Sequence, residues 1–456
     1  MRSELANFKQ GAMDGPSIQI DPLFPYYLNR SADSIAEEIQ LAGYRIVHYF
    51  VVNEHEVNGE LIEAFHRRDI AVWAMVIGNG TFSTSHLPPE WREWRMGLLK
   101  ELNDGFERFS PFSSAYVQWK KEAVARMLLE HPFDGIEIAE PYFPEWDGIR
   151  RGVYGDIGPA AQQAFDEKHG LAVPEFVNRF AANYYKKTPE TYAKWIDFRV
   201  EAVNGLIDEI INGSGGARAV RPDILVATWS LAVDGGAVST LRLKEWQGLD
   251  SISMIGRVKP DLHMLQTHWP DWMKRNLKPD YPRSYEGFAA PIRAAFPELP
   301  LGIQADIGSR TNMVKDRAWL NQFQNTVYDL GYHTWTAYEY HLGGYMYDDP
   351  PVPLTAGTRG DSEVVISFNK RIDPDSSGRI VPENDCGGHA EDEEEIRLEE
   401  RVVDGNRLRL RFNRLPDRRP FHVELRHVKD VPALWHVKGK RTNEIPDGTW
   451  ISVDET

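Results

Sequence analysis

The chain has 456 residues and a formal net charge of -16, with 42% hydrophobic and 26% charged residues, proportions that are ordinary for a globular protein. The negative charge repels phosphate backbones and anionic lipids, so we expect neither nucleic acid nor a membrane surface as a partner. A single cysteine, Cys386, excludes an intrachain disulfide and a zinc site built from several cysteines.

Apolar runs alternate with helical segments across residues 17–345. The runs that predict strands are rich in β-branched and aromatic residues and lie at 17–20, 45–52, 70–77, 134–139, 223–229, 261–267, 300–306 and 333–339. Segments with helical spacing predict helices between them, among others at 31–42, 56–67, 113–130, 189–212, 286–296 and 315–330. Eight apolar strands that alternate with helices favour a (β/α)8 TIM barrel over 17–349, with an open doubly wound sheet as the alternative.

The pattern changes after residue 349. Residues 350–361 (PPVPLTAGTRGD) predict a linker, because proline and glycine interrupt regular structure. The segments beyond it, such as 362–368, 406–412 and 420–427, alternate apolar and polar residues and predict a small all-β sandwich over 362–456.

The first 16 residues predict an N-terminal leader outside the barrel. They lack the apolar core of a signal peptide, and no apolar run of the chain is long enough to span a bilayer. A cytoplasmic location is therefore the default expectation, and secretion is the alternative if a leader has been removed.

Polar residues end or follow most of the predicted strands, where barrel enzymes place their active sites. These positions are Asp21, Asn53, Asn79, Glu137, Glu140, Trp229, His268, Asp306, Glu339 and His341. The carboxylates that come from the fourth, seventh and eighth strands are Glu137, Glu140, Asp306 and Glu339. Because two carboxyl groups that flank one bond can hydrolyse a glycoside, these four are the candidate catalytic residues.

Several aromatic residues stand beside proline or charged residues and are expected in loops, where their faces can stack on sugar rings. The expected substrate-binding residues are Asp21, Asn53, Asn79, Tyr142, Trp229, His268, Trp269, Tyr338 and His341.

The segment 133–142 (FDGIEIAEPY) resembles the fourth strand of barrel glycoside hydrolases, in which a DGI sequence precedes an acidic catalytic residue. Its Glu140-Pro141 ending is similar to the Asn-Glu-Pro of clan A enzymes, and the resemblance implies that Glu140 is the acid/base. Ala139 stands where clan A has Asn, and Asp306 ends the seventh strand where the clan has Glu. The run 154–176 also resembles a segment that follows this strand in beta-galactosidase-like and uncharacterised barrel glycosyl hydrolases.

In this interpretation Glu140 needs a raised pKa to hold a proton near neutral pH, and a neighbouring carboxylate such as Glu137 could raise it. Asp306 or Glu339 would then be the nucleophile of a retaining enzyme or the base of an inverting one.

The C-terminal segments VVISFNKRIDPDSS, DGNRLRLRF and HVELRHVKD resemble bacterial immunoglobulin-like domains that are appended to carbohydrate-active enzymes.

The sequence therefore predicts a glycoside hydrolase that acts on a neutral sugar or glycan by two-carboxylate chemistry. A barrel that binds carbohydrate without cleaving it and a barrel lyase or isomerase are the alternatives. No motif requires a metal or an organic cofactor, and the pattern indicates neither the sugar nor the oligomeric state.

Overall fold

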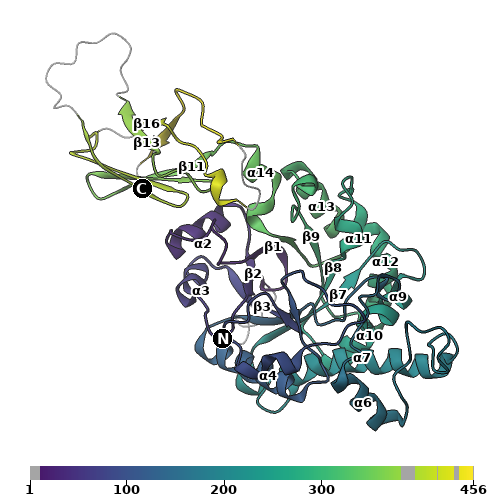
Figure 1. Ribbon diagram of the computed structural model, residues 1–456. Helices are drawn as coiled ribbons and strands as arrows, with labels where there is room; N and C mark the ends of the chain where they lie inside the picture. Colours follow the sequence, from purple (N-terminus) through teal and green to yellow (C-terminus); the bar gives the residue numbers. More distant parts are fainter. Residues whose placement is uncertain (1–10, 382–395, 418–419, 436–440, 455–456) are drawn as a thin grey trace, which may run out of the picture.

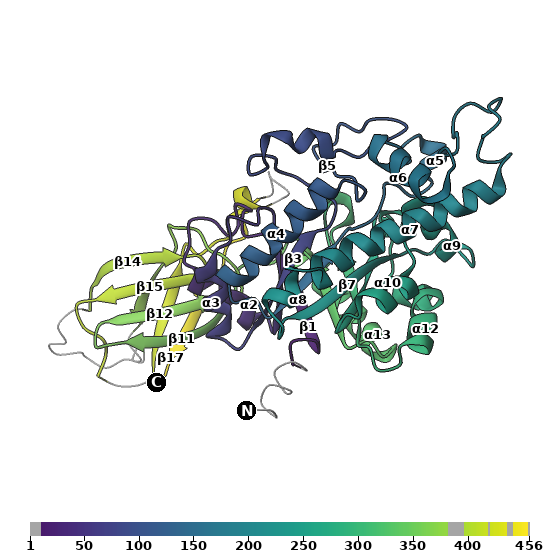
Figure 2. The same ribbon diagram turned by 90° about the horizontal axis from the view of Figure 1, so that it is seen from below.

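The computed structural model describes residues 11–381, 396–417, 420–435 and 441–454. These residues form a closed barrel of parallel strands, followed by a smaller domain of antiparallel sheets (Figure 1, Figure 2). The barrel order is β1-β10-β9-β8-β7-β6-β3-β2, so each barrel strand lies beside its neighbours in the sequence. The predicted (β/α)8 barrel is confirmed, and the open sheet is not formed.

Each barrel strand overlaps one of the predicted apolar runs. The strands are β1 (Gly15–Ile20), β2 (Ile46–Val51), β3 (Ala71–Ile77), β6 (Gly135–Ala139), β7 (Leu225–Ala232), β8 (Leu262–Thr267), β9 (Leu301–Asp306) and β10 (Thr334–Tyr338). Nearly all of their residues are buried, because helices cover the outer face and side chains fill the interior. Residues 1–10 of the expected leader, and Cys386, lie outside the described residues, and Gly15 already belongs to β1.

Helices surround the barrel. The longer ones are α2 (Ala32–Leu41), α3 (Gly59–His66), α4 (Ser114–Glu130), α6 (Pro159–His169), α7 (Pro189–Asn212), α9 (Ser239–Gln247), α10 (Ser251–Val258), α12 (Glu286–Ala295) and α13 (Arg317–Asp329). Single-turn helices are α5 (Gly148–Arg151), α8 (Ala217–Val220), α11 (Trp269–Trp272) and α14 (Gly344–Tyr347). Short 3-10 turns are η1 (Pro89–Trp94), η2 (Tyr281–Tyr285), η3 (Thr311–Met313), η4 (Tyr340–Leu342) and η5 (Pro432–Leu434). None of the described helices combines the length and apolar character that crossing a bilayer requires.

Two long excursions follow the carboxyl ends of β3 and β6. The first contains the short strands β4 (Gly80–Thr81) and β5 (Glu107–Arg108) together with η1, and the second contains α5 and α6. Figure 2 shows β5, α5 and α6 at the top of the view, above β3 and β7. Both excursions therefore wall the end of the barrel at which its strands terminate.

The Asp134-Gly135 sequence at the start of β6 is explained by the packing around it. The Asp134 carboxylate accepts a hydrogen bond from the backbone N–H of Val72 at 2.7 Å and contacts His66 at 3.0 Å, which ties β6 to β3. A side chain on Gly135 would place its Cβ atom 2.2 Å from the ring of Trp73, so only glycine fits beneath this ring. The motif thus serves the packing of the strand that carries Glu140.

The C-terminal domain consists of two antiparallel sheets. The first contains β11 (Pro353–Arg359), β12 (Glu363–Phe368), β15 (Arg407–Phe412) and β14 (Leu398–Asp404). The second contains β13 (Ser377–Val381), β16 (Phe421–Arg426) and β17 (Trp450–Val453). Alternate residues of β12, β15 and β16 meet in one apolar core between the sheets, as in a sandwich. The likeness to immunoglobulin domains stays a prediction.

The structure differs from the predicted linker at 350–361, because most of this segment forms β11. The strand pairs antiparallel with β12, from Pro353 opposite Phe368 to Arg359 opposite Glu363. Its side chains are half-buried or exposed throughout, so the strand lacks the alternating pattern that marks the others. Its pairing satisfies backbone groups at the edge of the sheet.

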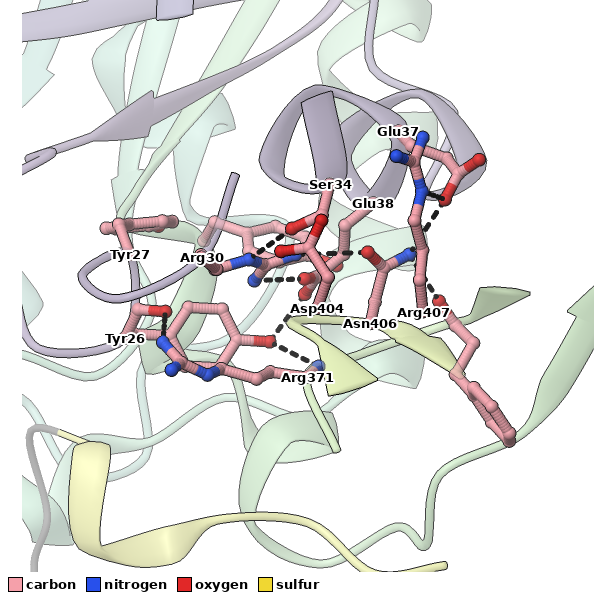
Figure 3. Close-up of polar contacts among 12 residues, drawn as sticks. Tyr26, Tyr27, Arg30, Ser34, Glu37, Glu38, Arg371, Asp404, Asn406 and Arg407 are labelled. Carbon is pink, nitrogen blue, oxygen red and sulfur yellow. Dashed lines mark hydrogen bonds and ion pairs between the residues drawn. The ribbon is translucent and has the colours of Figure 1, made fainter. Parts of the chain in front are cut away.

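The loop between β1 and α2 docks on the C-terminal domain (Figure 3). The Arg371 guanidinium donates hydrogen bonds to the carbonyl oxygens of Tyr26 and Leu28, both at 2.7 Å. The backbone N–H of Arg371 donates to the Tyr26 hydroxyl at 3.0 Å, and this hydroxyl donates to Glu38 at 2.5 Å. The C-terminal domain therefore fixes the loop that precedes α2.

A second set of contacts joins α2 and the two residues that precede it to β14, β15 and the turn between these strands. Arg30 donates to Asn406 at 3.1 Å, and Arg407 pairs with Glu37 at 2.6 Å. The backbone N–H of Ser31 donates to the Asp404 carboxylate at 2.7 Å. These charged contacts are partly buried, so they hold the domains more firmly than exposed ion pairs would.

We expect Arg371→Ala to lower the free energy of unfolding by about 1.5–3 kcal/mol, because the carbonyl oxygens of the β1–α2 loop would lose a charged donor. Arg379→Ala, which removes an exposed arginine of the same domain, is the matched control and should change stability little. Urea unfolding followed by tryptophan fluorescence measures both. Equal effects of the two substitutions would contradict the docking role of Arg371.

Candidate active site

A pocket with a volume of about 290 Å³ lies at the carboxyl end of the barrel. All eight barrel strands, or the residues directly after them, contribute to its wall. The lining residues are Gln19, Phe50, Met75, Ile77, Phe82, Ala139, Glu140, Trp229, Gln266, Thr267, Trp272, Gln304, Asp306, Ser309 and Tyr338. The closure of the barrel therefore brings two of the candidate carboxylates, Glu140 and Asp306, into one cavity.

Glu140 directly follows β6 and has a backbone φ of 51°, in the left-handed region that is costly for a residue with a side chain. Burial raises the pKa of its carboxyl group, and a hydrogen bond donated by Gln266 at 3.3 Å offsets this effect only in part. A strained backbone and a carboxyl group with a raised pKa in a pocket are typical of a functional site.

Asp306 ends β9 and is held by more hydrogen bonds than Glu140. Its carboxylate accepts from the backbone N–H groups of Gly308 at 3.0 Å and Ser309 at 2.9 Å, and also from the Ser309 hydroxyl. Burial still raises the pKa of Asp306, while these donors and nearby Lys315 act in the opposite direction. Because these donors favour the ionised form, Asp306 is the better placed of the two carboxyls to carry a negative charge.

Glu137 is fully buried, and the described lining of the pocket does not include it. One carboxylate oxygen contacts His48 Nδ1 at 2.7 Å, and the other accepts a hydrogen bond from Trp229 Nε1 at 2.8 Å. His48 Nε2 continues the chain to the Ser17 hydroxyl at 2.9 Å. Because both oxygens are engaged, the geometry favours Glu137 as the group that holds the Trp229 ring in the pocket wall.

Glu339 is also fully buried and fully engaged. Its oxygens accept hydrogen bonds from the backbone N–H of Asp21 at 2.7 Å and from the Tyr27 hydroxyl at 2.8 Å, and one contacts His341 Nδ1 at 2.6 Å. Burial and the charge of Glu339 raise the pKa of Asp21 to about 6. Glu339 therefore links the ends of β1 and β10 beside the pocket, and Asp21, Glu339 and His341 are absent from the described pocket wall.

Tyr338 shows how closely the acidic groups gather. Its hydroxyl has a raised pKa because of burial and because of the charges of Glu339, Asp306, Asp21 and Glu140. These carboxylates follow or end four different strands. Four acidic groups therefore lie near enough to the Tyr338 hydroxyl to raise its pKa.

The remaining predicted binding residues hold loops around the pocket. The Asn53 side chain accepts a hydrogen bond from the backbone two residues further on, at 2.9 Å, and Asn79 donates to the carbonyl oxygen of Tyr142 at 2.9 Å. His268 Nε2 contacts Gln247 at 2.8 Å, and burial lowers the pKa of this histidine to about 3. None of these residues belongs to the described pocket lining.

The aromatic residues that the sequence suggests for sugar binding differ in where they lie. Trp229 and Tyr338 line the pocket, whereas the ring of Trp269 is covered by the Arg151 guanidinium at 5.0 Å. The structure adds Trp272, which follows in the same helical turn and does line the pocket. Sequence reasoning selected the first tryptophan of this turn and missed the second.

Sequence reasoning also missed the three glutamines of the pocket wall, Gln19, Gln266 and Gln304. No sequence motif marks these glutamines, because a single neutral amide side chain within an apolar strand looks like any polar residue that the strand tolerates. The signal that could have found them is their position: each lies one or two residues before its strand ends, near the expected rim.

No family model matches the chain, and no curated protein matches it. Among solved structures, the glycoside hydrolase domain of PelA from Pseudomonas aeruginosa has 6% sequence identity and a TM-score of 0.40, covering 71% of this chain and 94% of its own. An endo-beta-1,4-mannanase from Thermotoga petrophila has 10% identity and a TM-score of 0.39, covering 98% of both chains. A beta-galactosidase from Rahnella sp. R3 has 12% identity and a TM-score of 0.48, covering 72% of this chain and 50% of its own. These three neighbours are glycoside hydrolases.

The geometry gives Glu137 a structural role and places Glu140 in the pocket wall, and stability measurements can test this difference. We expect Glu137→Ala to lower the free energy of unfolding by about 3–5 kcal/mol, because it leaves buried partners unpaired. Glu140→Gln should leave stability unchanged or raise it, because it replaces a buried carboxyl by a neutral amide. Thermal unfolding of both variants measures the difference. A greater loss in Glu140→Gln than in Glu137→Ala would contradict these assignments.

Proposed function

We propose that the protein is a glycoside hydrolase that cleaves a glycosidic bond of a neutral sugar in the pocket at the carboxyl end of its barrel. The observation that carries the proposal is that Glu140 and Asp306, from strands far apart in the sequence, line one cavity together with aromatic rings. Hydrolysis of an acetal needs two such carboxyl groups, one on each side of the bond that breaks.

In the proposed reaction Glu140 is the general acid. Burial raises the pKa of its carboxyl group and so favours the protonated form, which can donate its proton to the leaving oxygen. We assign the charged role to Asp306, because three hydrogen bonds from the loop after β9 favour its ionised form against the effect of burial. It acts as the nucleophile in a retaining reaction or as the base towards water in an inverting one.

The character of the pocket supports a neutral sugar as the substrate. The described lining contains no Lys, Arg or His, so no cation is available there to balance an anionic sugar. Trp229, Trp272 and Tyr338 provide aromatic faces of the kind on which the C–H groups of a sugar ring stack.

We expect Glu140→Gln to lower kcat by about 10²–10⁴-fold, the usual contribution of a general acid. Asp306→Asn should also lower kcat strongly, because an amide cannot supply the negative charge. The measurement is hydrolysis of a panel of nitrophenyl glycosides and polysaccharides by the purified full chain, first by the wild type to select a substrate.

Glu130→Gln is the matched control, because Glu130 is exposed at the end of α4, away from the pocket. It should retain wild-type activity. A Glu140→Gln variant that is as active as this control would exclude Glu140 as the acid, and a wild type that hydrolyses nothing in the panel would count against the proposed reaction.

We expect Gln266→Leu to shift the alkaline limb of the kcat/KM profile to higher pH. The Gln266 amide donates to the Glu140 carboxylate and so lowers its pKa, and removal of this donor raises the pKa. A general acid with a higher pKa keeps its proton to a higher pH, so activity persists further into the alkaline range. A pH–rate profile measures this; a shift to lower pH would contradict the assigned role of Glu140.

A further inference from the structure

We propose that Gln19, Gln266 and Gln304, here called the amide cluster, recognise the hydroxyl groups of one uncharged sugar ring and so determine the substrate of the pocket. The inference rests on the proposed function and adds the specificity of the same site. It concerns binding alone, so it can be tested apart from hydrolysis.

The amide cluster is built into the barrel wall. Gln266 on β8 and Gln304 on β9 are direct partners in the register of these neighbouring strands, so their side chains lie side by side. Gln304 also precedes Asp306 by two residues and therefore points to the same face of β9. Gln19 contributes from β1, and all three side chains line the pocket.

Two amide groups of the cluster have unmet hydrogen bonds. Gln19 is 2% exposed, and among the described residues its Nε2 has no hydrogen-bond partner. The Oε1 of Gln266 is likewise buried without a partner within the described part of the chain, while its Nε2 donates to Glu140. Buried polar groups in folded proteins are nearly always paired, so the donor of Gln19 and the acceptor of Gln266, on two residues that line one cavity, are the groups that a bound ligand would pair with.

A sugar hydroxyl matches these groups, because one hydroxyl both donates and accepts. One sugar hydroxyl can accept a hydrogen bond from Gln19 Nε2, and a second hydroxyl can donate a hydrogen bond to Gln266 Oε1. Amides offer no charge to a uronate, and Asp306, which already accepts three hydrogen bonds, is less available to a sugar ammonium. The groups with unmet hydrogen bonds are neutral, so the preferred ring is neutral.

The size of the pocket fits a single ring. Its volume of about 290 Å³ is at the lower end of the range for small-molecule sites, which is ~300–1,000 Å³. Its lining reaches Met75, two residues below the end of β3, and Trp229, three residues below the end of β7. A pocket that extends into the barrel in this way receives the end of a glycan more readily than its middle.

The test is binding of methyl glycosides to the full chain, measured by calorimetry. The probes are the methyl glycosides of glucose, galactose and mannose, the matched uronates, and the matched 2-amino sugars. We expect at least one neutral glycoside to bind, and its uronate and amino counterparts to bind at least tenfold more weakly. Gln19→Leu and, independently, Gln304→Leu should weaken binding of the neutral glycoside by about tenfold.

Gln322→Leu is the matched control, because Gln322 is exposed on α13, outside the barrel, and should bind like the wild type. Circular dichroism confirms that each variant is folded, and the two cluster variants provide separate tests. Absence of binding by every neutral glycoside, equal or tighter binding of a charged counterpart, or unchanged binding in both folded cluster variants would overturn the inference. Binding that depends on the amide cluster without hydrolysis of any glycoside would contradict the proposed reaction alone.

Discussion

Parallel strands that close into a barrel place all their carboxyl ends at one rim, and every feature of the candidate site depends on this closure. Glu140 and Asp306 are far apart in the sequence, yet they share one pocket because β6 and β9 belong to the same ring of strands. The apolar runs that form these strands are buried on both faces, so the rim is held by the core rather than by the site itself. The packing of the barrel core stabilises the fold enough to offset the desolvation free energy of the carboxyl groups at the rim.

The rim contains more acidic groups than the two that the proposed reaction would use. Their hydrogen bonds distinguish carboxylates with structural partners from carboxylates that line the pocket. Glu137 and Glu339 have each oxygen engaged by protein donors, so they position Trp229 and the ends of β1 and β10. Within the described part of the chain, the Glu140 carboxylate accepts a weak hydrogen bond from Gln266 at 3.3 Å, and its backbone is strained. The C-terminal domain supports the position of Glu339. It fixes the β1–α2 loop (Figure 3), and Tyr27 of this loop donates a hydrogen bond from its hydroxyl to Glu339.

The sequence predicts the barrel well, because continuous apolar runs bounded by turn residues mark each strand. It also places Glu140 and Asp306 at the ends of strands, where the structure has them, and their catalytic roles stay predictions. It fails at β11, whose half-exposed side chains carry no periodic signal. The partners of Glu137 were not predictable, because His48 lies within an apolar strand and meets Glu137 only after closure. The three glutamines of the pocket wall were not predictable for the same reason, because spacing in the sequence does not show which groups their side chains face.

The most direct test of this account is a crystal structure of Glu140→Gln soaked with an oligosaccharide that the wild type hydrolyses. We expect one sugar ring between residues 140 and 306, with the glycosidic oxygen within hydrogen-bond reach, about 2.6–3.2 Å, of the amide that replaces the Glu140 carboxyl group. The side chains of the pair should be about 5–9.5 Å apart, the range that glycoside hydrolysis uses. A sugar bound elsewhere, or a pair separated by more than this range, would contradict the central claim.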